Sequence, residues 1–236
     1  MKYIYKPKTK YEKFGLSVYK ILVENFSSSF FVGGIVRDIL LKKIVTDIDI
    51  ASSATPNEVE KLFVNKNFKI DLSFKNFGVV AIQQKQFTLT ISTFRKEKYV
   101  GSRFPKVVYV KTPKQDAQRR DFTINSLYLS VESSQILNFF SGLEDINCKQ
   151  IRFIGKPEQR IQEDPLRIVR AFRFAVKYNL KFEKNTLLAI EKYFILLQKI
   201  SKNKINSEIE KLSEKRKQKK LISLLDNKKM LDIYFK

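Results

Sequence analysis

The sequence predicts a mixed α/β region followed by an all-α region. A short apolar strand runs into two glycines (Gly33-Gly34) and then a helix, and strands of alternating polarity dominate residues 79–110. From about Glu163 the apolar residues instead recur with the 3.6-residue period of helices. We therefore expect two domains, over residues 1–145 and 146–236.

The α/β region is expected to begin with an amphipathic helix over residues 11–26, because its apolar residues share one side. Phe30–Val32 forms a short apolar strand before the glycines. Thr55 followed by Pro56 is typical of a helix cap and first helical position. The other expected elements are a helix at 36–41, strands at 44–50, 79–83, 87–94, 106–110 and 128–131, loops at 95–105 and 141–145, and helices at 163–178, 185–197, 205–215 and 219–226.

Positive charge dominates the composition: 46 Lys and Arg against 24 Asp and Glu give a formal charge of +22. Such a field attracts polyanions, so we expect nucleic acid as a partner. AT-rich coding drift is the alternative, since it raises Lys together with the 20 Phe and 10 Tyr. The sequence has no apolar stretch of membrane-spanning length and no signal-peptide pattern, so we expect a cytoplasmic protein with no membrane partner.

Histidine is absent and Cys148 is the single cysteine. This composition excludes His-based catalysis, Cys/His zinc sites and an internal disulfide. We expect Cys148 to be a small buried residue rather than a nucleophile.

Arginine is used sparingly, with 11 Arg against 35 Lys. A position that needs only a positive charge is therefore usually Lys, and an Arg indicates a need for its planar fork, which grips phosphate or a base edge with two bonds. Seven arginines fall in short clusters: Arg37, Arg95, Arg119, Arg120, Arg167, Arg170 and Arg173.

Asp47 and Asp49 lie two positions apart on the strand expected at 44–50, so both carboxylates should leave the same face. Two such acids can hold Mg²⁺ ions and position a hydroxyl against a phosphate. Gly33 and Gly34 precede them, and glycines let backbone N–H groups approach a triphosphate at a helix start. The alternatives are ordinary surface acids and a tight turn.

Two further clusters carry both signs of charge. Arg119 and Arg120 can hold phosphate while Asp121 accepts a bond from a ribose hydroxyl; the alternative is a local ion pair.

Asp164 and Arg167 lie three positions apart, on one face of the expected helix. An Asp accepts from the exocyclic amino group that cytosine and adenine share, and an Arg donates to the adjacent ring nitrogen, whereas uracil and guanine present unmatched groups. The alternative is an i, i+3 salt bridge.

These motifs, in this order, resemble those of the class II tRNA nucleotidyltransferases and bacterial poly(A) polymerases of the DNA polymerase beta superfamily. The resemblance covers roughly residues 28–175. The matching segments are Val32–Leu41, Thr46–Ala51, Thr93–Arg95, Arg119–Asn125, Arg152–Pro157 and Glu163–Ala175.

The resemblance implies a nucleotidyltransferase head with a mixed sheet over residues 1–145 and a helical neck over residues 146–236, with body and tail reduced. Asp47 and Asp49 would be the catalytic ligands of Mg²⁺, and segment 95–105 the family's flexible loop. The implied nucleotide contacts are Gly33, Gly34, Arg37, Arg119, Arg120, Asp121, Asn125, Asp164, Arg167, Arg170 and Arg173.

Three departures from the family pattern accompany the resemblance. Thr90 stands where the family usually has a Glu, and a Glu-Arg pair usual in the next neck helix reads Asn203-Lys204. In place of a full body and tail we expect the basic stretch 211–229, with eight Lys or Arg and two acids, to contact the tRNA backbone. The alternative is a solvated helix face. The RNA contacts expected there are Lys215, Arg216, Lys217, Lys219 and Lys220.

The segment Asn76–Val80 is similar to the CCA-adding pattern, and the longer basic strand signature of bacterial poly(A) polymerases is not evident near it. We expect a Mg²⁺-dependent enzyme that adds CCA to tRNA 3′ ends from CTP and ATP. The alternatives are a poly(A) polymerase or an enzyme that adds only the final A. An alternative of another class is a catalytically impaired RNA-binding protein, motivated by Thr90. Nucleotidyl transfer to a small molecule is disfavoured by the charge of +22.

Overall fold

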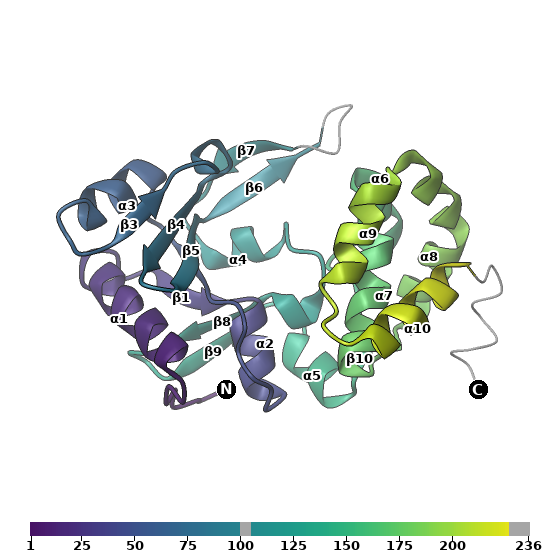
Figure 1. The fold of residues 1–236 in the computed structure, drawn as a ribbon, viewed down its shortest axis with the longest axis horizontal. Coiled ribbons are helices and arrows are strands. Elements are labelled where there is room, and N and C mark those ends of the chain that lie inside the picture. The colour runs from purple at the N-terminus through teal and green to yellow at the C-terminus, as the bar shows by residue number, and fades with distance from the viewer. Residues whose placement is uncertain (100–104, 227–236) are drawn as a thin grey trace. The chain divides into compact units, whose positions relative to one another are not determined.

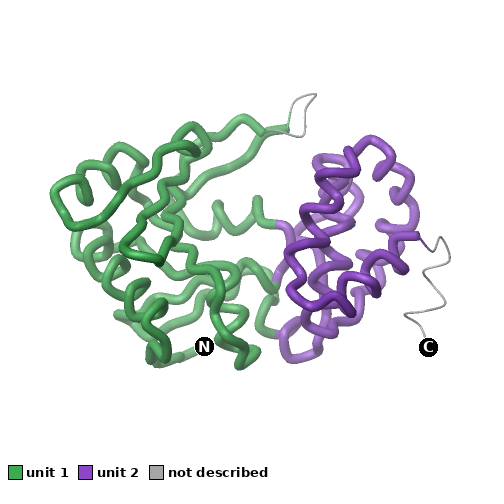
Figure 2. The backbone as a smooth tube through the Cα atoms, in the orientation of Figure 1, with its two compact units in different colours: residues 1–120, 124–143 green, residues 121–123, 144–236 purple. Residues whose placement is uncertain are grey.

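Residues 1–99 and 105–226 are described in the computed structural model, and they form two compact units (Figure 2). The first unit comprises Met1–Arg120 and Ile124–Leu143, and the second comprises Asp121–Thr123 and Glu144–Lys236. The first is a mixed α/β unit and the second is largely helical, which confirms the predicted fold class (Figure 1). In the part of the chain that the structure describes, no helix is both long and apolar enough to cross a membrane.

A seven-stranded mixed sheet forms the framework of the first unit, with the strand order β3-β4-β5-β2-β1-β8-β9. Among the described residues, β2 and β5 are its one parallel pair of neighbours, and the other neighbours run antiparallel. The strands are β1 (Ser29–Val32), β2 (Asp49–Ser52), β3 (Lys69–Asp71), β4 (Val79–Gln84), β5 (Phe87–Thr93), β8 (Leu127–Ser130) and β9 (Gln135–Asn138).

The two faces of this sheet are covered by different elements. Side chains alternate between the faces along a strand. In β1, Phe31 stacks on Tyr19 of helix α1 (Lys10–Asn25), with ring centroids 4.8 Å apart. Val32, the next residue of β1, faces the opposite side of the sheet, where it packs in a buried cluster with Ala51, Phe94, Ala117 and Tyr128.

Short helices complete the first unit. The predicted cap of α3 (Pro56–Phe63) is confirmed, since Thr55 and Glu58 form a reciprocal capping box. A separate two-stranded hairpin pairs β6 (Arg95–Lys98) with β7 (Lys106–Tyr109). The other helical segments are α2 (Gly34–Leu40), η1 (Lys75–Phe77) and α4 (Pro113–Ala117), and η2 (Thr123–Asn125) lies where the chain passes between the units.

The second unit is built around helix α7 (Leu166–Tyr178), most of whose residues are buried. Leu166 and Val169 pack with Ile200, and Ile205 and Leu225 cover this cluster. The remaining elements are α5 (Gly142–Asn147), β10 (Gln150–Ile151), α6 (Pro157–Glu163), β11 (Lys181–Phe182), α8 (Lys184–Tyr193), η3 (Phe194–Lys199), α9 (Lys202–Glu210) and α10 (Lys215–Asp226).

Two predicted loops were wrong. The segment 95–105 was expected to be a loop because it is polar, but residues 95–98 form β6, whose backbone pairs with β7 without an alternating apolar face. Residues 100–104 of that segment lie outside the described residues. The loop expected at 141–145 is instead occupied by α5 from Gly142 onward, and Cys148, just after this helix, is exposed rather than buried.

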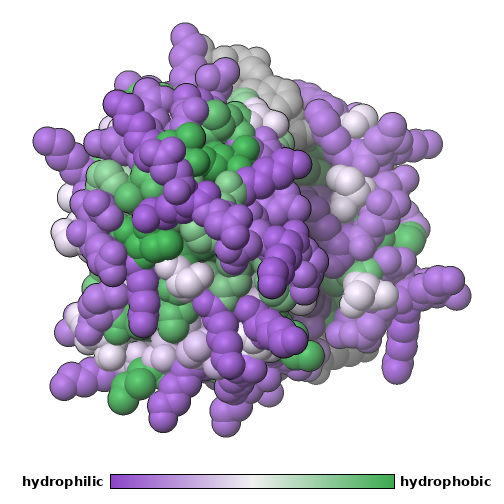
Figure 3. Space-filling view, turned by 60° about the vertical axis from the view of Figure 1, so that its left-hand side comes forward, coloured by the Kyte–Doolittle hydropathy of each residue, from purple (hydrophilic) through white to green (hydrophobic). Residues whose placement is uncertain are grey.

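Hydrophilic side chains predominate over a smaller hydrophobic area on the face shown in Figure 3. This distribution agrees with the 30% of charged residues in the sequence.

Candidate active site

The glycine turn after β1 has a backbone that demands glycine. Gly33 adopts φ +72° and ψ −122°, a conformation that L side chains rarely adopt. A Cβ on Gly33 would lie 3.3 Å from Nη1 of Arg120 and 3.9 Å from Oδ2 of Asp49. The turn therefore lets a guanidinium and a carboxylate approach the backbone closely, while Gly34 is the first residue of α2.

The two candidate metal ligands lie at the start of β2, not within a longer strand. The strand expected at 44–50 was wrong over residues 44–48: β2 begins at Asp49, and Asp47 is an exposed residue of the preceding segment. Among the described residues, β1 ends at Val32 and its last partner in β2 is Asp49, so β1 does not pair with residues 44–48.

Asp49 is half-buried and has a partner on the neighbouring strand. Thr90 of β5 is its register partner, and the Thr90 hydroxyl donates to Asp49 Oδ1 at 2.5 Å. The pKa of Asp49 is raised, mainly by burial and also by the nearby Asp47 charge. The hydrogen bond from Thr90 and the Arg120 cation lower this pKa, but by less. A carboxylate with a raised pKa close to a second carboxylate is a place where a cation is favourable.

Arg37 is not directed at solvent. Its guanidinium is buried, bonds the carboxylate of Asp38 through Nε at 2.9 Å, and donates through Nη1 to Asn125 Oδ1. Arg37 and Asn125, two of the predicted nucleotide contacts, are thus brought together within the first unit.

Arg119 and Arg120 share one buried carboxylate, Asp116, which was not among the residues predicted from the sequence. Arg119 Nε donates to Asp116 Oδ1 at 2.7 Å, and Arg120 Nη2 lies 3.2 Å from Asp116 Oδ2. The Tyr128 hydroxyl donates to the same Oδ2 at 2.5 Å and accepts from Arg120 Nε at 3.0 Å. Although burial opposes it, the charges of Arg119 and Arg120 lower the pKa of Asp116 to about 2, so this carboxylate is ionised. The spacing of three and four positions was the available sequence signal.

Arg95 adds a third guanidinium to this group. Its Nη1 is buried without a hydrogen-bond partner among the described residues, and its Nε lies 3.5 Å from Glu97, which also pairs with Arg119 at 3.0 Å. Burial and the neighbouring Arg119 charge lower the pKa of Arg95 to about 10. This cluster has more positive than negative charge and a donor to spare, a combination suited to an anion.

In the second unit, Asp121 is bound by Arg170. Arg170 donates to Asp121 Oδ2 through Nε at 2.9 Å and also through Nη2, while Asp121 Oδ1 accepts from the backbone of Phe122. Arg173 forms a buried ion pair with Glu208 at 2.9 Å, and Lys211 also bonds that carboxylate. Three of the predicted nucleotide contacts, Asp121, Arg170 and Arg173, are therefore held in ion pairs.

Asp164 and Arg167 do not share a helix, contrary to the prediction. Proline disfavours the helical conformation in the residue before it, and Asp164, which precedes Pro165, is extended (φ −151°, ψ 100°). The helix expected at 163–178 is therefore divided into α6, which ends at Glu163, and α7, whose Leu166 N–H donates to Asp164 Oδ1 at 3.2 Å. Arg167 is buried and donates to Glu163 at 2.7 Å and to the Arg160 carbonyl at 2.7 Å.

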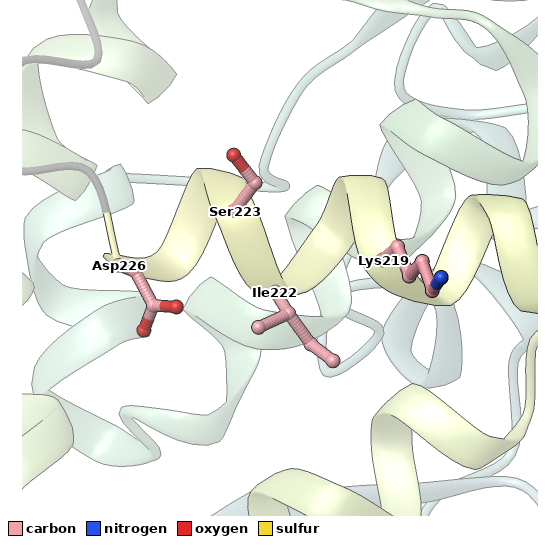
Figure 4. Close-up of a pocket in the computed structure, with 4 residues that line it drawn as sticks. All are labelled: Lys219, Ile222, Ser223 and Asp226. Carbon is pink, nitrogen blue, oxygen red and sulfur yellow. The ribbon is translucent and has the colours of Figure 1, made fainter.

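The predicted RNA contacts lie on α10. Lys215, Arg216, Lys219 and Lys220 are exposed, whereas Lys217 is partly buried and pairs with Glu214. A hollow of about 500 Å³ is lined by Lys219, Ile222, Ser223 and Asp226, all from this helix (Figure 4). It contains none of the predicted catalytic residues.

Comparison with known proteins identifies the family. The head domain of poly A polymerases matches residues 29–152. The CCA-adding enzyme of Streptococcus uberis is 40% identical over 199 residues, which is 84% of this chain and 48% of that protein. The chain belongs to the family of class II CCA-adding enzymes and poly A polymerases. This confirms the resemblance noted in the sequence.

Other members of the family give the same result. The CCA-adding enzyme of Bacillus subtilis is 37% identical over 212 residues, 89% of this chain and 52% of that protein. The structure of the Bacillus stearothermophilus CCA-adding enzyme in complex with CTP superposes with a TM-score of 0.76 and 31% identity, over 86% of this chain and 49% of that one. A tRNA nucleotidyltransferase complexed with a primer tRNA and an incoming ATP analog gives a TM-score of 0.73 at 27% identity, over 91% and 61% of the two chains. The chain spans about half the length of the curated relatives it matches.

Proposed function

We propose that this chain adds CCA to tRNA 3′ ends by Mg²⁺-dependent nucleotidyl transfer from CTP and ATP. The observation that carries the proposal is the grouping, within the first unit, of Asp49, the Gly33 turn and Arg120. A carboxylate and a guanidinium are both held against a backbone that has no side chain of its own. That grouping suits a metal-bound triphosphate, and the curated relatives are CCA-adding enzymes.

The donor set fits Mg²⁺. Among residues 1–99 and 105–226 there is no group of three or more acidic or Cys side chains that could hold a metal. Mg²⁺ nevertheless needs only one or two carboxylates when substrate phosphates and water supply the other oxygens. Asp47 and Asp49 would hold the ion, and when bound it would lower the pKa of the RNA 3′-hydroxyl and neutralise charge on the phosphates.

Side chains of this protein would bind the triphosphate and the base. In the reaction a bond forms between the RNA 3′ oxygen and the α-phosphorus, and the bond to pyrophosphate breaks. Arg119 and Arg120, fixed by Asp116, would neutralise the triphosphate, and the neighbouring Arg95 would add positive charge. Asp164 and Arg167 of the second unit would select C and A, with Arg167 held in place by Glu163.

An extension assay tests this proposal. We would offer tRNA lacking its 3′ end, tRNA ending in CC, and an unstructured RNA, each with Mg²⁺ and with CTP and ATP separately and together. Three additions to the first tRNA followed by a stop are expected, and Asp47→Ala should abolish them. Addition of A alone to the CC end, or long A tails on any RNA, would assign the alternative activities. Tight tRNA binding without extension would indicate an RNA-binding protein.

A further inference from the structure

Thr90 is joined to the Asp49 segment at two points. Its hydroxyl donates to Asp49 Oδ1 at 2.5 Å, and its backbone N–H donates to the Ile48 carbonyl at 3.1 Å. Both contacts depend on the parallel register of β2 and β5, which sets Thr90 opposite Asp49. The hydroxyl is therefore carried by a strand and not by a loop.

A bond to one oxygen of a carboxylate decides where the other oxygen points. The terminal torsion of Asp has broad, shallow minima, so an unbonded carboxylate can rotate. With Oδ1 held by Thr90, Oδ2 of Asp49 faces the glycine turn, 3.9 Å from where a Cβ on Gly33 would lie. Nη1 of Arg120 lies on the same side, 3.3 Å from that point. The free oxygen is directed toward the place where the proposed triphosphate would meet Arg120.

The strand opposite Asp49 supplies no third acid, because Thr90 stands where the family usually has a Glu. No acid occurs between Asp71 and Glu97, so the strand opposite Asp49 contributes a hydroxyl and no negative charge. A hydroxyl that donates to one oxygen of a carboxylate fixes the orientation of that carboxylate. The second oxygen remains available as a metal ligand.

We propose that Thr90 is a positioning residue: its hydroxyl orients Asp49 so that two carboxylates, Asp47 and Asp49, hold the divalent cation without a third. The inference rests on the proposed function only in assigning Asp47 and Asp49 as metal ligands.

The test compares four substitutions in the full chain. Thr90→Val removes the hydroxyl but keeps a β-branched strand residue, and Thr90→Ser keeps the hydroxyl. Thr88→Val is the matched control, because Thr88 lies two positions earlier on the same face of β5 and is exposed. Asp49→Asn removes the proposed ligand itself. Urea unfolding of each variant establishes that it is folded.

The first measurement is Mn²⁺ affinity by electron paramagnetic resonance, with a CTP analogue that cannot transfer its nucleotide. Thr90→Val should weaken Mn²⁺ binding about tenfold, the scale expected for the loss of a partner to a metal ligand. Thr90→Ser and Thr88→Val should bind as the unsubstituted chain does. Wild-type affinity in Thr90→Val, or equal losses in Thr90→Val and Thr90→Ser, would overturn the proposal.

The second measurement is single-turnover extension of tRNA. Thr90→Val should lower the rate at saturating CTP with little change in the CTP concentration that gives half of that rate, since the hydroxyl acts on the metal ligand and not on the nucleotide. If the unsubstituted chain does not extend tRNA but Thr90→Val still weakens Mn²⁺ binding relative to Thr88→Val, the proposed function fails and the positioning role stands. If Asp49→Asn binds Mn²⁺ like the unsubstituted chain, both fail.

Discussion

Nε of Arg119 lies 2.7 Å from Oδ1 of Asp116, three positions earlier in the chain. The same carboxylate bonds Arg120, so one fully buried acid fixes two consecutive arginines. It also accepts the backbone N–H of Arg95 at 3.1 Å. The three arginines of the proposed triphosphate site thus all contact one buried carboxylate, and Glu97 lies beside two of them.

Asp116→Asn should destabilise the chain strongly, because it leaves the two arginine charges without their buried partner. We expect a loss of about 3 kcal/mol in the free energy of unfolding, measured with urea. Tyr128→Phe is the control: it removes a hydroxyl from the same network but keeps the charges paired, and should cost about 1 kcal/mol. Equal effects of the two substitutions would contradict the role given to the Asp116 charge.

Stability in acid should also depend on Asp116. Its pKa is lowered from 3.8 to about 2 in the folded chain, so the stabilisation from its ionised form is complete above pH 3.8 and is lost as the pH falls toward 2. Between those pH values the unfolding free energy of the unsubstituted chain should fall more steeply than that of Asp116→Asn. Parallel curves in urea titrations across this range would refute the assignment.

Gly33→Ala and Gly34→Ala should behave differently although they are adjacent. Alanine at position 33 meets a backbone unsuited to it and a Cβ position 3.3 Å from Arg120, so we expect a loss of about 1 to 3 kcal/mol and weaker CTP binding. A Cβ on Gly34 has its nearest neighbour at 3.6 Å, an ordinary contact. Urea unfolding and calorimetric titration with CTP measure both effects, and a tolerated Gly33→Ala would refute the requirement.

Asp164→Asn should relax the choice of base. Asparagine keeps an oxygen for the Leu166 N–H but replaces the other carboxylate oxygen with a donor, which suits a carbonyl. The ratio of kcat/KM for CTP to that for UTP should fall about tenfold, the scale of one charged hydrogen bond. Glu158→Gln, an exposed change on α6, is the control. An unchanged ratio would argue against base reading by Asp164.

Replacing Lys215, Lys219 and Lys220 of α10 by alanine should weaken tRNA binding and its salt dependence together. Each lost phosphate contact should lower the slope of log affinity against log salt by about one. The matched control removes three exposed lysines from α1: Lys10, Lys13 and Lys20. Equal losses from both triple variants would mean that the whole positive field, and not α10, attracts tRNA.

The sequence was sufficient for those parts of the site that depend on local structure. Gly33 was predicted from the strand, glycine and helix order, and it has the positive φ that such a turn requires. The fold class was also predictable, because alternation and helical periodicity are local properties. Asp164 and Arg167 were predicted to share a helix, but Pro165 disfavours the helical conformation in the residue before it, and Asp164 is extended.

The features of the site and fold that could not be predicted from the sequence depend on tertiary contacts. Asp116 lies in a polar segment, and nothing in its neighbourhood indicates full burial; Tyr128 meets it only because β8 joins the sheet. The bond from Thr90 to Asp49 requires two strands that are far apart in sequence to be aligned. The strand β6 was missed because its side chains are mostly charged and its pairing is carried by the backbone.

The parallel pairing of β2 and β5 has a kinetic consequence. Asp49 and Thr90 are separated by 41 positions, whereas β4 and β5 form a hairpin with a short turn. A long segment loses more conformational freedom on closure than a hairpin does, and such distant contacts slow folding. The β4–β5 hairpin can therefore form early, but the carboxylate and its hydroxyl partner meet only when β2 docks beside it. Folding chains should therefore pass through a stage in which the β4–β5 hairpin is formed and the bond between Thr90 and Asp49 is not.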